Sequence, residues 1–275
     1  MGLFDAFKKK DCEICGKEVG MFGYKKLEDG EICKDCVKLL SPWFDDRRHS
    51  TVEQIKQQLI YRENNKKELA DFRASQVIGD NYKMYVEEVN GVPTRFLVTD
   101  ADSYMDENPD IIEFKDLLSC TADIQTDERE LKRDDGNGNE VSYDPPRYET
   151  EYEFYINMNI ANNPYFDDIN FKLNNGTVTL ETRAGATNSF LGMNFSTGPV
   201  DVSSHREQER YQKYKEMCLQ IEQVVQRSRM APQTVSANVA PAPEAAPAQS
   251  GPKFCTNCGA PADGGKFCQS CGSKL

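Results

Sequence analysis

Eight of the ten cysteines fall into four Cys-x-x-Cys pairs, and this pattern constrains the fold more than any other feature of the chain. The pairs form two groups; 17 residues separate the pairs of the first group and 9 residues those of the second. The eight residues are Cys12, Cys15, Cys33, Cys36, Cys255, Cys258, Cys268 and Cys271. Each group offers four thiolates to one ion, which is the closed tetrahedral ligand set of structural zinc sites.

Glycine follows three of the four pairs, at Gly16, Gly259 and Gly272. Glycine accepts the positive φ that ends a tight turn, so these pairs are expected to form turns in which two sulfurs converge on one ion. Cys36 is followed by Val37 instead, and we expect this pair to run into a helix.

Cys-x-x-Cys pairs can also form disulfides, act as redox pairs or bind iron. The first ten residues show no export signal, so we expect a cytoplasmic protein whose thiols stay reduced rather than form disulfides. A redox pair belongs on a thioredoxin-like βαβ unit, which neither flank shows. Iron in a rubredoxin-like site uses the same turns and stays open beside zinc. Because each set already holds four cysteines, we expect two structural Zn²⁺ ions and no catalytic metal.

The C-terminal module, residues 253–275, is too small to fold on its own core. Its only large apolar residues are Phe254, Phe267 and Leu275. Ordering the backbone costs ~1–2 kcal/mol per residue. We therefore expect metal binding, ~10–16 kcal/mol in small zinc modules, to supply its folding free energy.

Both cysteine groups resemble known modules. Residues 254–275, FCTNCGAPADGGKFCQSCGSKL, resemble the short zinc-ribbon tail of many bacterial proteins. Residues 12–44, CEICGKEVGMFGYKKLEDGEICKDCVKLLSPWF, resemble a bacterial four-cysteine finger of uncharacterised function that begins multi-module cytoplasmic proteins. These resemblances imply zinc binding and no particular activity.

Composition divides the rest of the chain. Residues 230–252 are rich in proline and alanine and cannot bury a core, which predicts a disordered linker. The expected order is a four-cysteine finger (1–48), a linker helix (49–67), a β-rich domain with a C-terminal helix (68–229), the linker (230–252) and the zinc ribbon (253–275).

Turn signals and periodicity predict the elements. Hairpins are expected around Asp29-Gly30 and Asn90-Gly91, and a third joins strands 169–173 and 178–182. Strands are expected near 117–124 and along 148–160, where residues alternate with period two. Helices are expected over 51–64, capped by Thr51, and over 204–229, begun by a Ser204–Glu207 capping box. The apolar stripe of the second helix contains Tyr211, Tyr214, Cys218, Ile221 and Val225.

Hairpins followed by one amphipathic helix resemble the order of elements in pleckstrin-homology-like domains. The expected fold class is α+β: a pleckstrin-homology-like barrel or bent sheet, capped by the C-terminal helix and flanked by two small zinc modules. An α+β sheet of another topology is the rival.

The negative charge is concentrated in residues 100–153, which hold 18 acidic and 5 basic side chains, while the whole chain carries −12. This stretch is interpreted as a solvated surface or as a docking surface for a basic protein. Its aspartates, Asp100, Asp102, Asp106 and Asp110, lack the spacing of a calcium loop. The domain also lacks the Lys/Arg cluster that a phosphoinositide headgroup needs.

No residue set suggests catalysis, so we expect no enzyme. His49 and His205 lie near no nucleophile motif, and Cys120 and Cys218 are expected to be buried thiols. No apolar run reaches the ~18 residues of a membrane helix. Residues 1–10 suit peripheral membrane contact, although an arm packed on the finger is preferred.

The expected function is that of an interaction or scaffold protein whose partner is a protein. The alternative is a nucleic-acid-binding protein that uses the ribbons. The finger carries ten basic and ten acidic residues and thus no electrostatic footprint, whereas the ribbon is mildly basic.

Overall fold

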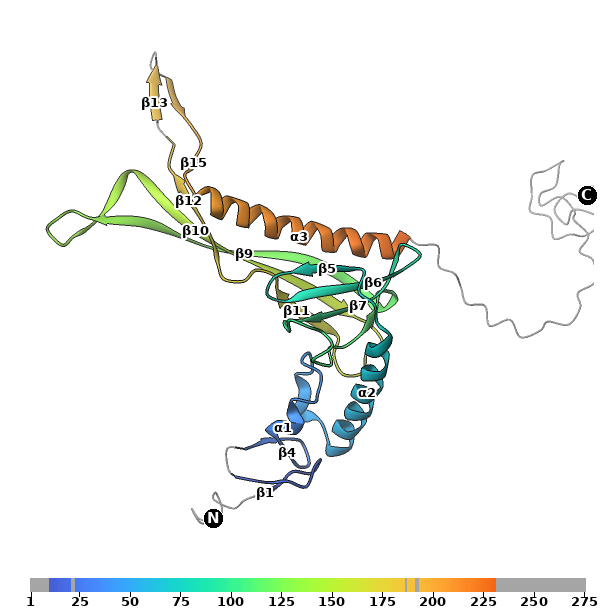
Figure 1. The fold of residues 1–275 in the computed structure, drawn as a ribbon. Coiled ribbons are helices and arrows are strands. Elements are labelled where there is room, and N and C mark those ends of the chain that lie inside the picture. Colours follow the sequence, from blue (N-terminus) through green and yellow to red (C-terminus); the bar gives the residue numbers. More distant parts are fainter. Residues whose placement is uncertain (1–9, 21–22, 186, 191–192, 231–275) are drawn as a thin grey trace, which may run out of the picture. The chain divides into compact units, whose positions relative to one another are not determined.

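The computed structural model describes residues 10–20, 23–185, 187–190 and 193–230, which belong to one compact unit (Figure 1). The C-terminal cysteines, the Pro/Ala-rich segment and residues 1–9 lie outside these residues. Among the described helices, none is long and apolar enough to span a membrane.

The N-terminal part is a small module followed by a long helix. Its short strands are β1 (Lys10–Asp11), β2 (Glu18–Val19), β3 (Tyr24–Lys26) and β4 (Glu31–Cys33). The helical turns α1 (Lys34–Val37) and η2 (Asp46–His49) follow, and then the helix α2 (Val52–Asp71). β3 and β4 form the expected hairpin around Asp29-Gly30.

α2 begins where expected and ends later. The Thr51 hydroxyl accepts from the backbone N–H of Gln54, and the Gln54 side chain accepts from the backbone N–H of Thr51, which makes a capping box. The helix continues to Asp71 rather than to residue 64. Ile60 is 64% exposed, whereas the polar side chains of Gln58, Arg62 and Asn65 on the same helix are buried.

The β-rich part contains two antiparallel sheets. One has the order β5-β6-β7-β8, and the other has the order β11-β10-β12-β15, with β9 also paired to β10. The first four strands are β5 (Gln76–Gly79), β6 (Lys83–Val89), β7 (Val92–Thr99) and β8 (Ile112–Glu113). The others are β9 (Leu117–Asp134), β10 (Glu140–Ile160), β11 (Asp168–Lys172), β12 (Val178–Arg183) and β15 (Val200–Asp201). A separate small hairpin pairs β13 (Thr187–Phe190) with β14 (Met193–Ser196).

The barrel alternative is wrong, because the two sheets do not close on each other. The single turn η3 (Phe114–Asp116) takes the chain from β8 in one sheet to β9 in the other. Buried Phe114 lies at this corner. The fold is α+β with separate sheets; the pleckstrin-homology-like topology stays a prediction.

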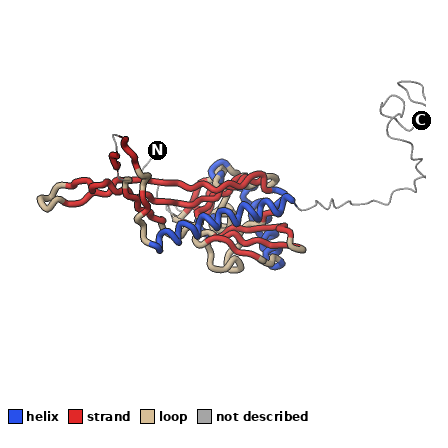
Figure 2. Tube along the Cα trace, turned by 90° about the horizontal axis from the view of Figure 1, so that it is seen from above, coloured by secondary structure: helices blue, strands red, loops and turns tan. Residues whose placement is uncertain are grey.

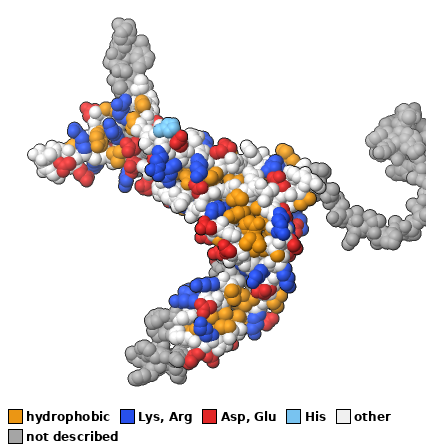
Figure 3. Space-filling view, viewed as in Figure 1, with side chains coloured by type: hydrophobic (Ala, Val, Ile, Leu, Met, Phe, Trp, Pro, Cys, Tyr) orange, Lys and Arg blue, Asp and Glu red, His pale blue; other side chains and the backbone are white. Residues whose placement is uncertain are grey.

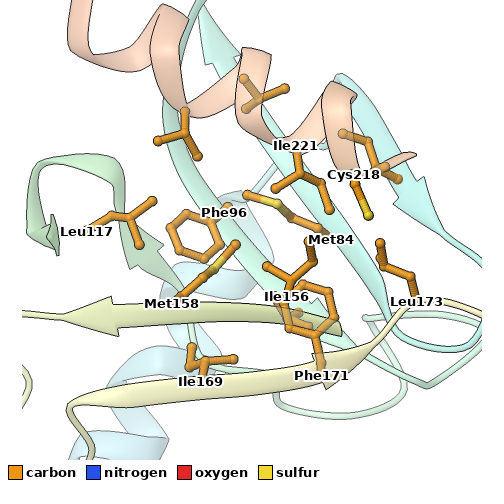
Figure 4. Packing of buried hydrophobic residues seen from close by; sticks show 14 of the residues in the cluster. Met84, Phe96, Leu117, Ile156, Met158, Ile169, Phe171, Leu173, Cys218 and Ile221 are labelled. Atoms are coloured by element: carbon orange, nitrogen blue, oxygen red, sulfur yellow. The ribbon is translucent and has the colours of Figure 1, made fainter. Parts of the chain in front are cut away.

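One hydrophobic core joins both sheets to the helix α3 (His205–Met230) (Figure 4). Figure 2 shows α3 running along the sheets. Met84 and Phe96 come from the first sheet, Ile156 and Phe171 from the second, and Ile221 from α3, and each is at most 2% exposed. α3 therefore covers the sheets as the apolar stripe predicts.

The helix α3 confirms half of the expected capping box. The backbone N–H of Glu207 donates to the Ser204 hydroxyl at 3.3 Å. The Glu207 carboxylate turns elsewhere, accepting from the Thr179 N–H at 3.2 Å and pairing with Arg210 at 2.9 Å. The start of α3 is thus tied to β12 instead of closing on itself.

The Asn90-Gly91 hairpin is confirmed, with φ of 54° and 78° at its two turn residues. The hairpin expected between residues 169–173 and 178–182 is wrong. β11 and β12 do not pair with each other, because both pair with successive parts of β10. Buried Asn174 lies at the junction, where its side-chain oxygen accepts from the Phe154 N–H at 2.8 Å and its amide donates to the Gly176 carbonyl at 2.7 Å.

Candidate metal centre

The first cysteine pair forms a tight turn between β1 and β2. The N–H of Gly16 donates to the Cys12 carbonyl at 2.8 Å, and Gly16 has φ of 71°, a conformation that glycine adopts without strain. The N–H of Cys12 donates to the Lys17 carbonyl. The glycine after this pair therefore serves the turn that was expected of it.

The second pair runs from a strand into a helix, as expected. Cys33 ends β4 and caps α1, and its sulfur accepts from the Cys36 N–H at 3.3 Å. The N–H of Cys33 donates to the Cys12 sulfur at 3.2 Å. The hairpin of β3 and β4 thus carries the second pair to the first.

All four sulfur atoms lie within 4.8 Å of one another. The Sγ atoms of Cys12 and Cys36 are 3.9 Å apart, and those of Cys15 and Cys33 are 3.8 Å apart. In a tetrahedral site with Zn–S bonds of about 2.3 Å, sulfurs lie about 3.8 Å from each other. The donor set and its spacing are compatible with one metal ion such as Zn²⁺.

The site is part of the core of its module. Cys12, Cys33 and Cys36 are at most 5% exposed, whereas Cys15 is exposed. They pack with apolar residues of the hairpin, of the chain after α1 and of α2, namely Leu27, Ile32, Leu40 and Ile55. An ion held here would join the turn between β1 and β2 to β4 and α1, which supply the four sulfurs.

Backbone amides prepare one thiol for binding. Burial raises the pKa of Cys12, but backbone N–H groups of Cys33, Cys15 and Ile14 outweigh it and lower the pKa to about 6. Burial, together with the three neighbouring thiols, raises the pKa of Cys36. Four thiols this close cannot all lose their protons without a compensating positive charge, which a divalent ion supplies.

A buried polar cluster ties this module to the β-rich part. The Ser41 hydroxyl, which lies just after α1, donates to Asp110 Oδ2 at 2.7 Å. Arg62 of α2 donates to Asp110 Oδ1 at 2.6 Å and to the Leu39 carbonyl at 3.3 Å. Asn65 donates to the Pro109 carbonyl at 2.7 Å. We call this set, Ser41, Arg62, Asn65 and Asp110, the buried joint.

The buried joint was not predictable from the sequence patterns, although Asp110 is one of the aspartates of the acidic stretch 100–153. Asp110 is 0% exposed and is not part of a solvated surface. The spacing of Arg62 and Asn65, three residues apart on one helix face, was the only local signal. Polar side chains at such spacing are usually exposed.

Aromatic contacts lie beside the joint. Trp43 packs against Tyr82 with ring centroids 6.0 Å apart, and Phe44 meets Tyr165 edge-on at 6.5 Å. Tyr61 of α2 also packs on Tyr165, at 5.1 Å. Trp43 packs against the core of the two sheets.

The two lone cysteines and the two histidines lie in different environments. Cys218 is buried and Cys120 is half-buried against the core, and burial raises their pKa values to about 11 and about 12. The side chains of His49 and His205 are 82% and 84% exposed. Cys255, Cys258, Cys268 and Cys271 lie outside the described residues.

Comparison with known proteins gives one match. A family model described as a domain of unknown function (DUF4428) matches residues 10–58, which hold the four cysteines, α1 and the start of α2. No curated protein and no solved structure matches the chain.

Proposed function

We propose that this protein is a non-catalytic interaction protein whose N-terminal module is held together by a structural zinc ion. The observation that carries the proposal is the closed set of four cysteine sulfurs, three of them buried in the core of the module. A catalytic zinc site has three protein ligands and one position for water. Here the fourth position belongs to Cys15.

The proposal includes a second structural zinc ion, held by Cys255, Cys258, Cys268 and Cys271. It rests on their spacing and on the lack of apolar residues in that module. Eight thiols proposed to bind metal suit a reducing compartment such as the cytoplasm. Pleckstrin-homology-like domains suggest by analogy that the β-rich part contacts a protein partner.

Metal content tests the zinc sites directly. Elemental analysis of the reduced full chain should find two equivalents of zinc. Cys33→Ser should remove one equivalent and Cys268→Ser the other, whereas the matched control Cys120→Ser should keep both. Fewer than one equivalent in the wild type, or iron in place of zinc, would overturn the assignment.

A binding assay separates the interaction role from its alternative. The full chain is passed over immobilised nucleic acid at low and at moderate salt. An interaction protein should flow through in both, because the finger carries balanced charge and residues 100–153 are acidic. Retention that falls steeply with salt would favour the nucleic-acid reading and contradict ours.

A further inference from the structure

The strands β9 and β10 form a ribbon that continues beyond the start of α3 (Figures 1 and 2). β10 is covered on its other edge by β11 and β12, but within the described residues β9 pairs with β10 alone. From Gln125 to Asp134 one edge of β9 therefore presents backbone N–H and C=O groups without a strand partner. Such an edge is a template for another strand.

This edge has no proline and no bulge, which are two of the features that prevent edge pairing; it does carry charged side chains, which are a third. Prolines and bulges blunt the edges of natural sheets. The irregularity of this ribbon falls on β10, between Ser142 and Arg147, where Pro145 and Pro146 lie. β9 itself runs regularly from Ser119 to Asp134 and contains no proline.

The tip of the ribbon is weakly supported as it stands. Residues 132–134 of β9 pair with residues 140–142 of β10 without a third strand, and an isolated two-stranded ribbon is marginally stable in water. Asp127 lies directly opposite Glu151 in β10, and Glu149 lies directly opposite Glu181 in β12. Like charges at opposite positions destabilise a sheet.

The charges of β9 suit pairing with a second copy of itself. Two β9 strands related by a two-fold axis pair antiparallel, and residues that face each other share one face of the joint sheet. If Glu130 lies on the axis, Glu128 faces Lys132 and Asp127 faces Arg133, and each pairing occurs twice. Figure 3 shows acidic and basic side chains interspersed on this ribbon.

Neighbouring registers are less favourable. Centred on Arg129, the pairing sets Glu128 against Glu130; centred on Leu131, it sets Arg129 against Arg133. Centred on Glu128, it sets Asp127 against Arg129, but Arg129 already forms an ion pair with Glu149. Asp127, Lys132 and Arg133 form no salt bridge within the described part of the chain. The register centred on Glu130 therefore uses charges that are still available.

We propose that two copies of this protein pair antiparallel through the free edge of β9, about a two-fold axis at Glu130. The backbone groups supply the hydrogen bonds, and the Glu128–Lys132 and Asp127–Arg133 pairs select the register. The two Glu130 carboxylates face each other and oppose the association.

Sedimentation equilibrium of the zinc-loaded full chain tests this. The wild type should show a concentration-dependent monomer–dimer equilibrium. Glu128→Lys places like charges at two positions and should weaken the dimer about tenfold. The double variant Glu128→Lys/Lys132→Glu restores opposite charges and should return the affinity toward the wild-type value. Glu130→Gln should tighten the dimer, since it removes the central repulsion.

The matched control is Asp168→Lys, the same kind of charge reversal on β11, across β10 from β9. It should leave the dimer unchanged. A wild type that stays monomeric at about 100 µM, or a Glu128→Lys defect that the charge swap does not repair, overturns the proposal. Zinc content and circular dichroism confirm that each variant is folded.

Discussion

Arg62 and Asp110 form a buried ion pair, with 2.6 Å between Nη1 and Oδ1 and with side chains 7% and 0% exposed. Arg62 belongs to α2, and Asp110 precedes β8 in the first sheet. Burial raises the pKa of Asp110 above its ordinary value, and the contacts with Arg62 and Ser41 offset only part of this rise. The pair is one of the contacts that join the metal module to the β-rich part.

Removing one partner of the ion pair is expected to lower the free energy of unfolding more than replacing both partners with apolar residues. Arg62→Ala leaves a buried carboxylate without its cation, which costs about 3–5 kcal/mol of the free energy of unfolding. Arg62→Met combined with Asp110→Leu removes both charges and should cost less than either single change. Urea unfolding followed by circular dichroism measures all of these. A double variant as unstable as the sum of the single variants would contradict this account.

Zinc removal is expected to change the environment of Trp43, the only tryptophan of the chain. Soon after Cys36 the chain is bound at two points: Arg62 donates to the Leu39 carbonyl, and the Ser41 hydroxyl donates to Asp110. Trp43 comes next and packs against Tyr82. Loosening the module should therefore expose the indole. A strong chelator should shift Trp43 emission to longer wavelength, and added zinc should reverse the shift.

The matched control for this experiment is Lys17→Ala, which removes an exposed ion pair with Asp35 and keeps the Lys17 carbonyl that accepts from the Cys12 N–H. It should respond to chelator as the wild type does. Zinc loss without any change in Trp43 emission would show that the metal site and the joint are independent.

Glu87 is expected to make stability depend on pH in the acidic range. Burial raises its pKa, but Arg95 at 2.6 Å and the Arg73 N–H at 2.8 Å outweigh this and lower it. A carboxyl with a lowered pKa stabilises the fold above its unfolded-state pKa, about 4.3, and loses that effect as pH falls through its folded-state value.

Glu87→Gln should therefore destabilise the protein by about 1.5–3 kcal/mol at pH 7, and the difference from the wild type should shrink below pH ~4.5. Thermal or urea unfolding at a series of pH values measures it. The comparison variant is Glu88→Gln, at a neighbouring position that faces Arg227 near the surface. A Glu87→Gln difference that stays constant down to pH 3 would contradict the assignment.

The Asn174 side chain is expected to stabilise the connection between β11 and β12. Asn174→Ala leaves the buried Phe154 N–H without its side-chain acceptor and should cost about 1–3 kcal/mol. Asn175→Ala, an exposed neighbour, is the control, and its effect should stay below about 0.5 kcal/mol. Equal losses in the two variants, measured by urea unfolding, would rule out this role.

Features that depend on neighbours in sequence were predictable. The spacing of Cys12, Cys15, Cys33 and Cys36 placed four sulfurs around one centre, because a two-residue gap and a hairpin impose that proximity. Asn90-Gly91 specified its turn through positive φ, and Thr51 marked the start of α2.

Features that depend on residues distant in the sequence were not predictable. The sequence around Asn174 is typical of a hairpin turn. In the structure the Asn174 side-chain oxygen accepts from the Phe154 N–H, 20 residues away, and β11 and β12 both pair with β10. The barrel prediction failed for a similar reason, since nothing local specifies that the turn at Phe114 leads into a different sheet.

The sequence by itself determined the four-cysteine cluster, the turns and the apolar stripe of α3, because Cys-x-x-Cys turns, a hairpin and a helical repeat depend only on residues close in the chain. Tertiary structure alone decided that Arg62 and Asn65 face inward, because a buried charge is tolerated only when a partner neutralises it. That partner, Asp110, lies 48 residues further along the chain.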